Sequence, residues 1–295
     1  MSTETVDMRF ADLDRWPTEG AVQAMLEGQM VAIAALQGQV ATIASASEAA
    51  ADRLRGGGRL VYAGAGTSGR VAIQDGVELT PTYNWPRERL VFLLAGGEGA
   101  LLKSAEGAED DADAARREVA AAGVGAGDVV IGVAASGRTP YTLAAIEAGV
   151  AAGALTVAVT NNAGAPLATA AAYAIVAVTG AELVAGSTRM KAGTAQKAAL
   201  NLLSTTIMLR LGLVYRGMMV NMRISNDKLL GRARAMVADI AGVDAVTAAA
   251  ALEAGGHDIK RAALIARGLD APAAAALLDL HGADLRGALG ALAHG

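Results

Sequence analysis

The chain has 295 residues, enough for one large domain, or for a medium domain and a small one, with a substantial buried core. Its 25 basic and 29 acidic residues give a net charge of −4, which argues against nucleic acid or an anionic membrane as the main partner. It has no cysteine, which excludes disulfides and thiolate catalysis and fits a reducing cytosol. The N-terminus is acidic and polar, unlike a signal peptide, and the longest charge-free stretch (148–181) is interrupted by Asn, Gly and Pro. We therefore expect a cytoplasmic protein without a membrane span.

In chain order, the sequence predicts an arm, helices, and then alternating strands and helices. Residues 1–19 are rich in Thr, Asp and Glu and have Pro17 near their end, so we expect an extended arm. Apolar residues fall at helical spacing over Val22–Leu54, which predicts one or two amphipathic helices. Five short apolar segments follow that are typical of strands: Arg59–Ala63, Leu90–Ala95, Asp128–Val133, Leu155–Thr160 and Tyr173–Val178.

Near-continuous aliphatic strands separated by helices predict a parallel sheet covered on both faces, an α/β fold of three layers. Lys191–Leu211 has few helix breakers and is predicted to be one long helix. From about Gly231 the chain changes to short alanine-rich helices with Gly and Pro between them. We therefore divide the chain into an arm with helices (1–55), a sheet domain (56–230) and a small helical domain (231–295).

Two loops rich in Gly, Ser and Thr follow predicted strands. GAGTSGR (64–70) comes after the first strand, and ASGRTPY (135–141) comes after the third. Hydroxyls and backbone N–H groups with a helix N-terminus behind them suit a phosphate. Because ligands of parallel sheets bind outside the strand C-termini, both loops can share one pocket. The sequence therefore predicts a site for a small phosphorylated molecule.

Two other interpretations of these loops are weaker. Gly64–Gly69 satisfies the dinucleotide fingerprint, but the second strand ends at Leu93–Gly97 without the acidic residue that binds a ribose. Glycines that only make tight turns explain one loop, but not the recurrence of hydroxyls in both. Neither loop has the Gly-Lys-Ser/Thr ending of a P-loop. The histidines, His257, His281 and His294, lie in the tail without ligand spacing, so no metal or other cofactor is predicted.

Proton chemistry in the sheet domain must use carboxylates, Lys or Tyr, because this domain contains neither His nor Cys. Glu78 lies just after the helix predicted to follow the first loop, where one more helical turn would keep it near the pocket. Glu106–Asp111 is a second acidic site. Acids are also common at helix starts, and the residues alone favour that interpretation for Glu106–Asp111.

Five motifs in this order, GRLVYAGAGTSGR, EGAEDD, ASGRTPY, GSTRMKAGTAQK and NDKL, resemble the N-acetylmuramic acid 6-phosphate etherase family. The resemblance covers roughly Leu13 to Val243, and GSTRMKAGTAQK is long enough to be specific. It implies a sugar isomerase (SIS) domain with a flavodoxin-like sheet, and a ubiquitin-associated-like helical domain in the tail. A weaker resemblance extends to the glucokinase regulatory protein, which binds phosphosugars without turnover.

The resemblance implies a lyase that cleaves the D-lactyl ether at C3 of N-acetylmuramic acid 6-phosphate. The products are N-acetylglucosamine 6-phosphate and D-lactate, a step of peptidoglycan recycling that uses no cofactor. Glu78 matches the general acid of the family and Glu109 its general base. Because the two carboxylates have opposite duties, we expect different surroundings, with Glu78 the more buried.

For the phosphate, the wider SIS pattern implies the hydroxyls of Ser68, Ser136 and Thr139 and the backbone N–H of Gly137. Thr67 is a helper by the same pattern.

The lactyl carboxylate needs a cation, and the sequence leaves its identity open among Arg138, Arg189 and Lys191. Arg189 and Lys191 also suit surface cations of a helix. Glu182 is present in the family at this point and is implied to contact sugar hydroxyls.

The chain departs from the family pattern at Leu79-Thr80, where Cys-Pro is usual, and at Asn221, where Asp is usual. These departures leave the exact substrate preference open. The resemblance also implies a homodimer whose site is completed by the partner subunit, with Val22–Leu54 and Lys191–Leu211 as interface candidates. Two other functions stay open: a non-catalytic phosphosugar-sensing regulator, and an aldose–ketose phosphosugar isomerase on the same fold.

Overall fold

The computed structural model describes residues 3–103 and 105–294. The chain divides into two compact units, which we call the sheet unit (Met1–Val77 with Arg87–Ile207) and the helical unit (Glu78–Pro86 with Met208–Gly295). Each is described by itself. The predicted domain limits at residues 55 and 230 differ from this division, which follows packing rather than sequence composition, and they stay a prediction.

The sheet unit contains five parallel strands in the order β2-β1-β3-β4-β5. The strands are β1 Leu60–Gly64, β2 Leu90–Leu94, β3 Val129–Val133, β4 Leu155–Thr160 and β5 Tyr173–Val176. The prediction of a five-stranded parallel sheet in a flavodoxin-like order is thereby confirmed.

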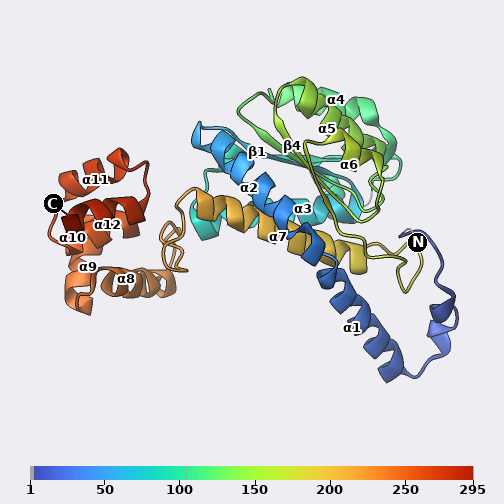
Figure 1. Ribbon diagram of the computed structural model, residues 1–295, viewed down its shortest axis with the longest axis horizontal. Coiled ribbons are helices and arrows are strands. Elements are labelled where there is room, and N and C mark those ends of the chain that lie inside the picture. The colour runs from blue at the N-terminus through green and yellow to red at the C-terminus, as the bar shows by residue number, and fades with distance from the viewer. Residues whose placement is uncertain (1–2, 104, 295) are drawn as a thin grey trace. The chain divides into compact units, whose positions relative to one another are not determined.

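Helices cover both faces of this sheet, as predicted (Figure 1). On one face lie α4, α5 and α6, and on the other lie α2, α3 and α7. The bounds are α1 Thr18–Ala34, α2 Val40–Arg55, α3 Gly66–Tyr83, α4 Ala112–Ala121, α5 Pro140–Ala151, α6 Pro166–Ala170 and α7 Lys191–Arg210. The long helix predicted after residue 190 is therefore confirmed, and the predicted helical region before residue 55 consists of α1 and α2.

The aliphatic strands reflect burial on both faces. β1 and β3 are buried over their whole length. On the α4–α5–α6 face, Val61 and Val130 pack with Tyr141 and Ile146 of α5. On the other face the ring of Tyr62 is almost completely buried. A sheet that is covered on both sides needs apolar residues at every position, which explains the absence of alternation in these strands.

The order of the strands indicates where a ligand would bind. β1 pairs with both β2 and β3, so the chain proceeds in opposite directions on its two sides. The crevice at such a switch point, at the carboxyl ends of the strands, is where open α/β sheets bind ligands. Both Gly/Ser/Thr-rich loops start there, because one follows β1 and the other follows β3.

Helix α3 is longer than the sequence predicted. It continues to Tyr83 with Pro81 inside it, so Glu78 lies within the helix and the expected helix end before Glu78 is wrong. A proline in a helix interior costs about 3 kcal/mol. Leu79 and Tyr83, one turn apart on α3, are both buried, and burial of this face offsets the cost.

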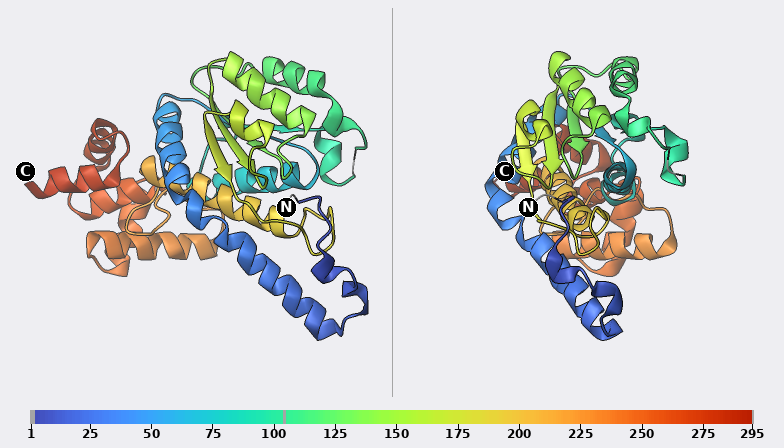
Figure 2. Two further views of the ribbon diagram at one scale, coloured as in Figure 1. Left: turned by 45° about the vertical axis from the view of Figure 1, so that its right-hand side comes forward. Right: turned by 90° about the vertical axis from the view of Figure 1, so that its right-hand side faces the viewer.

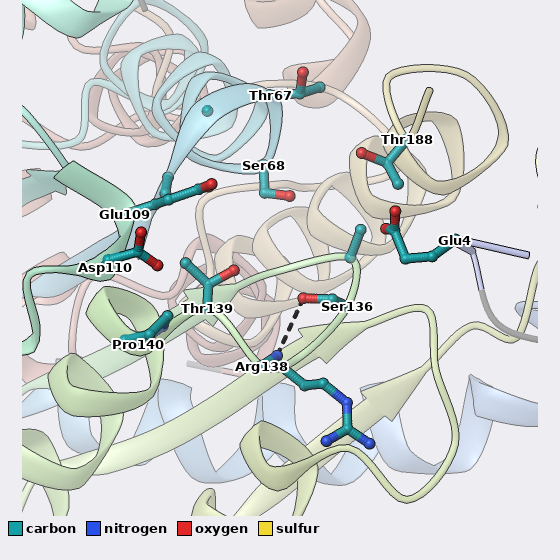
Figure 3. Close-up of a pocket in the computed structure, with 13 residues that line it drawn as sticks. Glu4, Thr67, Ser68, Glu109, Asp110, Ser136, Arg138, Thr139, Pro140 and Thr188 are labelled. Atoms are coloured by element: carbon teal, nitrogen blue, oxygen red, sulfur yellow. Dashed lines mark hydrogen bonds between the residues drawn. The ribbon is translucent and has the colours of Figure 1, made fainter. Parts of the chain in front are cut away.

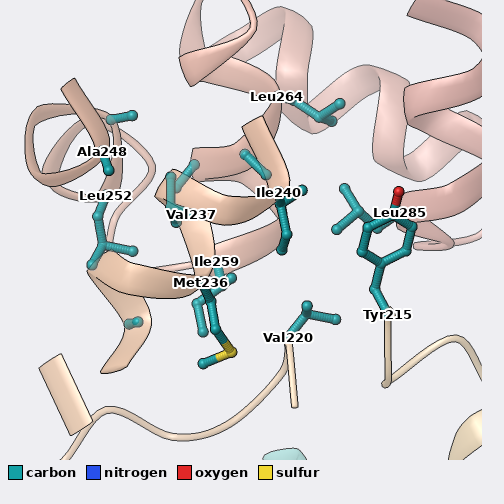
Figure 4. Packing of buried hydrophobic residues seen from close by; sticks show 14 of the residues in the cluster. Tyr215, Val220, Met236, Val237, Ile240, Ala248, Leu252, Ile259, Leu264 and Leu285 are labelled. Carbon is teal, nitrogen blue, oxygen red and sulfur yellow. The ribbon is translucent and has the colours of Figure 1, made fainter. Parts of the chain in front are cut away.

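The helical unit has its own apolar core (Figure 4). Its helices are α8 Asp227–Ala241, α9 Ala245–Ala254, α10 Ile259–Ala266, α11 Ala271–Leu280 and α12 Leu285–His294. Val237 and Ile240 of α8 pack with Leu252 of α9 and Leu264 of α10. Short helices of this kind need good caps, and the residues before α8 to α11 each accept a backbone N–H with the side chain: Asn226, Asp244, Asp258 and Asp270.

Among the described residues, Thr18–Arg55 is a helical stretch long and apolar enough to cross a membrane by length and composition. A short turn, Gln37–Gln39, separates its two helices. α2 lies along the sheet and buries Ile43 and Leu54, whereas α1 projects away from the sheet (Figure 2). The expectation of a protein without a membrane span stays a prediction.

Candidate active site

A cavity of about 400 Å³ lies between the two loops at the carboxyl ends of β1 and β3 (Figure 3). All of its lining belongs to the sheet unit. The lining residues are Glu4, Ala65, Gly66, Thr67, Ser68, Glu109, Asp110, Ala135, Ser136, Arg138, Thr139, Pro140 and Thr188. The structure thus brings together most of the residues predicted from the two loops, and it adds one of the two predicted catalytic carboxylates, Glu109.

The first loop turns directly from β1 into α3. Gly66 has a φ of +53°, a conformation that is strained for residues with a side chain. A Cβ on Gly64 would lie 2.8 Å from the Cα of Gly69, so the strand and the helix approach closely only because both residues are glycines. Ser68 is buried and Thr67 is half-buried in the first turn of α3. Their hydroxyls therefore lie at a helix N-terminus, where partial positive charge gathers.

The second loop leads into the N-terminus of α5 and places hydroxyl groups there. Thr139 is the N-cap residue of α5 but makes no side-chain capping hydrogen bond, so its hydroxyl stays available to a ligand. The Ser136 hydroxyl accepts the backbone N–H of Arg138 at 3.2 Å. Gly137 has a φ of +63°, and its N–H, predicted for the phosphate, donates to the carbonyl oxygen of Ala134 at 3.1 Å. Contact between this N–H and a phosphate stays a prediction.

The geometry of the cavity suits an oxyanion. The hydroxyls of Ser68, Ser136 and Thr139 lie around one space, beside the N-termini of α3 and α5 (Figure 3). Hydroxyl donors combined with two helix N-termini are a recurrent way to bind phosphate. Arg138, the one cation that the described part of the chain contributes to the lining, turns its guanidinium away from these hydroxyls (Figure 3). A bound phosphate would therefore depend on hydroxyls and helix ends more than on an ion pair.

Glu109 reaches the cavity from a short turn, Ala108–Asp110, which starts after Gly107 at a φ of +73°. Within the described residues no hydrogen bond or ion pair holds its carboxylate, which leaves the group free for chemistry. Asp111, by contrast, caps α4 and accepts the N–H of Ala114 at 2.8 Å. The acidic run therefore begins a helix and also places Glu109 at the cavity, and a role of this acid in proton chemistry stays a prediction.

Arg70 positions the segment that leads to Glu109. Its guanidinium donates to the carbonyl oxygens of Ala100 at 2.8 Å and of Leu101 at 3.0 Å. These two residues belong to the turn Glu98–Leu101, which follows β2. The sequence did not predict this contact, because an arginine one residue after a glycine loop gives no indication of a carbonyl partner about thirty residues away.

Glu78, the predicted general acid, is not among the residues that line the cavity. It comes ten residues after Ser68 on α3, nearly three helical turns, and belongs to the helical unit. Glu78 and Glu109 are both exposed in the single chain, so the expected difference in burial is not observed. The catalytic role of each stays a prediction.

The predicted binding residues Glu182, Arg189 and Lys191 lie outside the lining of the cavity, as Gly137 does. The buried Glu182 caps α7, because its carboxylate accepts the N–H groups of Lys191 at 3.0 Å and of Ala192 at 2.9 Å. Lys191 is buried too and donates to the carbonyl oxygen of Ala181 at 2.6 Å. Burial lowers the pKa of Lys191, while the charges of Glu182 and Asp7 oppose that shift. Arg189 is exposed, and substrate contact by any of the three stays a prediction.

Thr188 and Glu4 line the cavity from outside the two loops and the acidic run, and neither was predicted as a site residue. Thr188 lies inside the motif GSTRMKAGTAQK, so the motif itself indicated a functional segment. Glu4 comes from the N-terminal arm, where only the acidic character of the arm gave a signal. No group of three or more His, Cys, Asp or Glu side chains that could hold a metal occurs in the described part of the chain.

Comparisons with known proteins show the family of the chain. The family model described as the glucokinase regulatory protein N-terminal SIS domain matches residues 40–150, and the SIS domain model matches residues 110–206. The N-acetylmuramic acid 6-phosphate etherase of Deinococcus radiodurans is 48% identical over 260 residues, which cover 88% of this chain and 85% of that protein. The protein of the same name from Mycolicibacterium smegmatis is 41% identical over 292 residues, 99% of this chain and 98% of that one. Among solved structures, a phosphoheptose isomerase from Francisella tularensis is 19% identical with a TM-score of 0.46, and the match covers 66% of this chain and 98% of that one.

Proposed function

Because the chain belongs to the N-acetylmuramic acid 6-phosphate etherase family, we propose that it is a carbon–oxygen lyase that cleaves the D-lactyl ether of N-acetylmuramic acid 6-phosphate. The products are N-acetylglucosamine 6-phosphate and D-lactate. The observation that carries the proposal is the cavity in which three hydroxyls at two helix N-termini face the same space as the Glu109 carboxylate, which no other described residue pairs with. A phosphorylated sugar with an acidic carbon next to its aldehyde fits both features.

The chemistry proceeds by elimination and then addition. With the sugar ring open, the C2 proton lies beside the C1 aldehyde, and the Glu109 carboxylate removes it. The C3–O bond then breaks, the electron pair leaves with the lactate oxygen, and a general acid protonates that oxygen. Water adds to C3 of the unsaturated aldehyde, and a proton returns to C2. The phosphate at C6, held by Ser68, Ser136 and Thr139, keeps C2 close to Glu109 during these steps.

We assign the general acid to Glu78 of a second copy of the chain in a homodimer. Glu78 and its neighbour Val77 are both exposed on α3, and Val77 keeps 47% of its surface open. A two-fold dimer would bring an exposed face of one copy against the pocket of the other. The exposed apolar residues of α1 suit the same interface: Val22, Leu26, Met30, Val31 and Ile33.

One assay tests the activity against its alternatives. The purified protein is mixed with N-acetylmuramic acid 6-phosphate, and released D-lactate is measured. Release supports the lyase. Ketose formed from an aldose phosphate, with no lactate, supports an isomerase instead, and binding without turnover supports a phosphosugar sensor.

A mixing experiment tests the shared site. Glu78→Gln and Glu109→Gln subunits are each inactive by this proposal, and a mixed dimer has one pocket with both glutamates intact. Random mixing should therefore restore about a quarter of the normal activity, since half of the dimers are mixed and half of their sites are complete. No recovery after verified subunit exchange would mean that both carboxylates act within one subunit.

We place this reaction in the cytoplasm, because the chain has no cysteine and its substrate is a phosphorylated sugar. Neither a cofactor nor nucleic acid has a part in the proposed chemistry.

A further inference from the structure

The N-terminal arm is anchored beside the cavity by a residue far away in sequence. Thr3 is completely buried, and its backbone N–H donates to Oδ1 of Asn162 at 3.2 Å. The Asn162 side-chain amide in turn donates to the Thr3 hydroxyl at 3.0 Å and to the carbonyl oxygen of Ala135 at 2.9 Å. Asn162 therefore ties the arm to the second phosphate loop. The arm lies beside the segment between β5 and α7 in both views of Figure 2.

This anchor places the next residue, Glu4, in the wall of the cavity. Its carboxylate and that of Glu109 lie on opposite sides of the hydroxyls of Ser68 and Ser136 (Figure 3). Glu4 is exposed, and its one hydrogen bond among the described residues is a long one, 3.4 Å from the Thr3 hydroxyl. No ion pair within the described residues neutralises it, so the carboxylate keeps most of its capacity to accept hydrogen bonds.

The charge of Glu4 restricts what it can contact. An ionised carboxylate accepts hydrogen bonds and repels a phosphate, so it does not belong to the phosphate subsite. It faces the same space, however, and can accept hydrogen bonds there. The uncharged part of a sugar phosphate offers such donors in its hydroxyl and amide N–H groups.

We propose that Glu4 is a specificity-determining residue that accepts hydrogen bonds from the sugar hydroxyl or amide N–H groups while the loops hold the phosphate. The sugar then lies between Glu4 on one side and Glu109 on the other. A ligand without these donors leaves the Glu4 carboxylate unpaired, and sites of this kind discriminate strongly against such ligands. The inference rests on the proposed function for the identity of the sugar, but not for the class of ligand.

Calorimetric binding of two probes to the full-length protein tests this. The probes are N-acetylglucosamine 6-phosphate and inorganic phosphate. The Glu4→Ala variant should bind the sugar phosphate about 10-fold to 100-fold more weakly, the usual range for losing a charge-assisted hydrogen bond. Its affinity for inorganic phosphate should stay the same or rise, because a repelling charge is removed. Glu4→Gln keeps one acceptor oxygen, so its loss should be smaller than that of Glu4→Ala.

Glu19→Gln is the matched control, since Glu19 is an exposed acid at the start of α1 and does not line the cavity. Asn162→Ala tests the anchor, because it releases the arm. Adding Glu4→Ala to this variant should reduce the affinity for the sugar phosphate little further, so the two effects should not add. If Glu4→Ala lost affinity for both probes equally, or for neither, the proposal would be overturned. Because binding is measured, a wild-type protein that releases no lactate would contradict the proposed reaction but not the role of Glu4.

Discussion

At the amino ends of β1 and β3, N–H groups of Arg59 and Gly125 donate to the carboxylate of Asp128. At the carboxyl ends of the same strands, the carboxylate of Glu109 has no donor within the described residues. Asp128 accepts the N–H of Arg59 at 2.8 Å, its guanidinium at 2.7 Å and the N–H of Gly125 at 3.0 Å. One end of the sheet thus uses its acid for stability, and the other keeps an acid unpaired in a cavity.

The difference teaches where to look for chemistry in this fold. A buried and fully paired carboxylate stabilises the protein but has no acceptor left for a substrate. An exposed carboxylate beside helix N-termini contributes little to stability, and its position is explained better by a ligand. Substitutions at the two ends should therefore separate activity from stability.

The largest expected effect is on activity at the carboxyl end. Glu109→Gln should reduce D-lactate release by about 10²-fold to 10⁴-fold, the usual contribution of a general base, while changing the free energy of unfolding by less than about 0.5 kcal/mol. The exposed Glu88, in the turn that precedes β2 at the opposite end of the sheet, gives the matched control Glu88→Gln, which should keep full activity. Comparable activity of Glu109→Gln and wild type would remove Glu109 from the mechanism.

A second effect, in binding, concerns the hydroxyls. Ser136→Ala should weaken the binding of inorganic phosphate by about 10-fold to 100-fold, because a hydrogen bond to a charged group is worth about 1.5–3 kcal/mol. Thr188→Val removes a hydroxyl in the same cavity outside the two loops, and it should leave phosphate binding nearly unchanged. Equal losses of phosphate affinity in both variants would mean that phosphate does not bind specifically at the two loops.

A third effect, on stability, belongs to the amino end. Asp128→Asn places an amide where the guanidinium of Arg59 and the N–H of Gly125 need an acceptor. We expect a loss of about 1–3 kcal/mol in the free energy of unfolding by urea, with unchanged catalysis per folded molecule. Unchanged stability, or a specific loss of kcat, would break the contrast between the two ends.

The smallest effect is on the pH dependence of stability, to which Asp128 and Asp75 should contribute with opposite signs. Hydrogen bonds from Arg59 and Gly125 outweigh the opposing effect of burial and hold the pKa of Asp128 below 3.8, so its stabilisation is present above that pH and lost as the pH falls through the lowered pKa. Burial raises the pKa of Asp75, although Asn201, Tyr62 and Ser204 hydrogen-bond to it. Its ionisation therefore costs stability as the pH rises from 3.8 through the raised value.

Urea unfolding of each Asp→Asn variant against wild type checks these signs. The advantage of wild type over Asp128→Asn should grow with rising pH below 3.8, and that over Asp75→Asn should shrink with rising pH above 3.8. If both advantages changed with pH in the same direction, the opposite pKa shifts of Asp128 and Asp75 would be contradicted.

The sequence predicted the sheet and the two loops because their signals are local. Aliphatic runs followed by Gly, Ser and Thr define β1 and β3, and the order of the motifs placed both loops at the same edge. It did not predict Glu4, whose position depends on the contact between Thr3 and Asn162, 159 residues apart. It also did not predict that Glu182 caps α7, because a carboxylate beside a conspicuous motif suggests a ligand as readily as a helix end.

The most direct test of a base at the β1–β3 edge is exchange of the substrate C2 proton with solvent. N-acetylmuramic acid 6-phosphate is incubated with Glu109→Gln in deuterated water, and deuterium at C2 is followed by NMR alongside wild type. We expect deuterium to enter at C2 with the wild type and not with the variant. Exchange that persists at the wild-type rate in Glu109→Gln would show that another group removes the proton, and the assignment of Glu109 as the general base would be wrong.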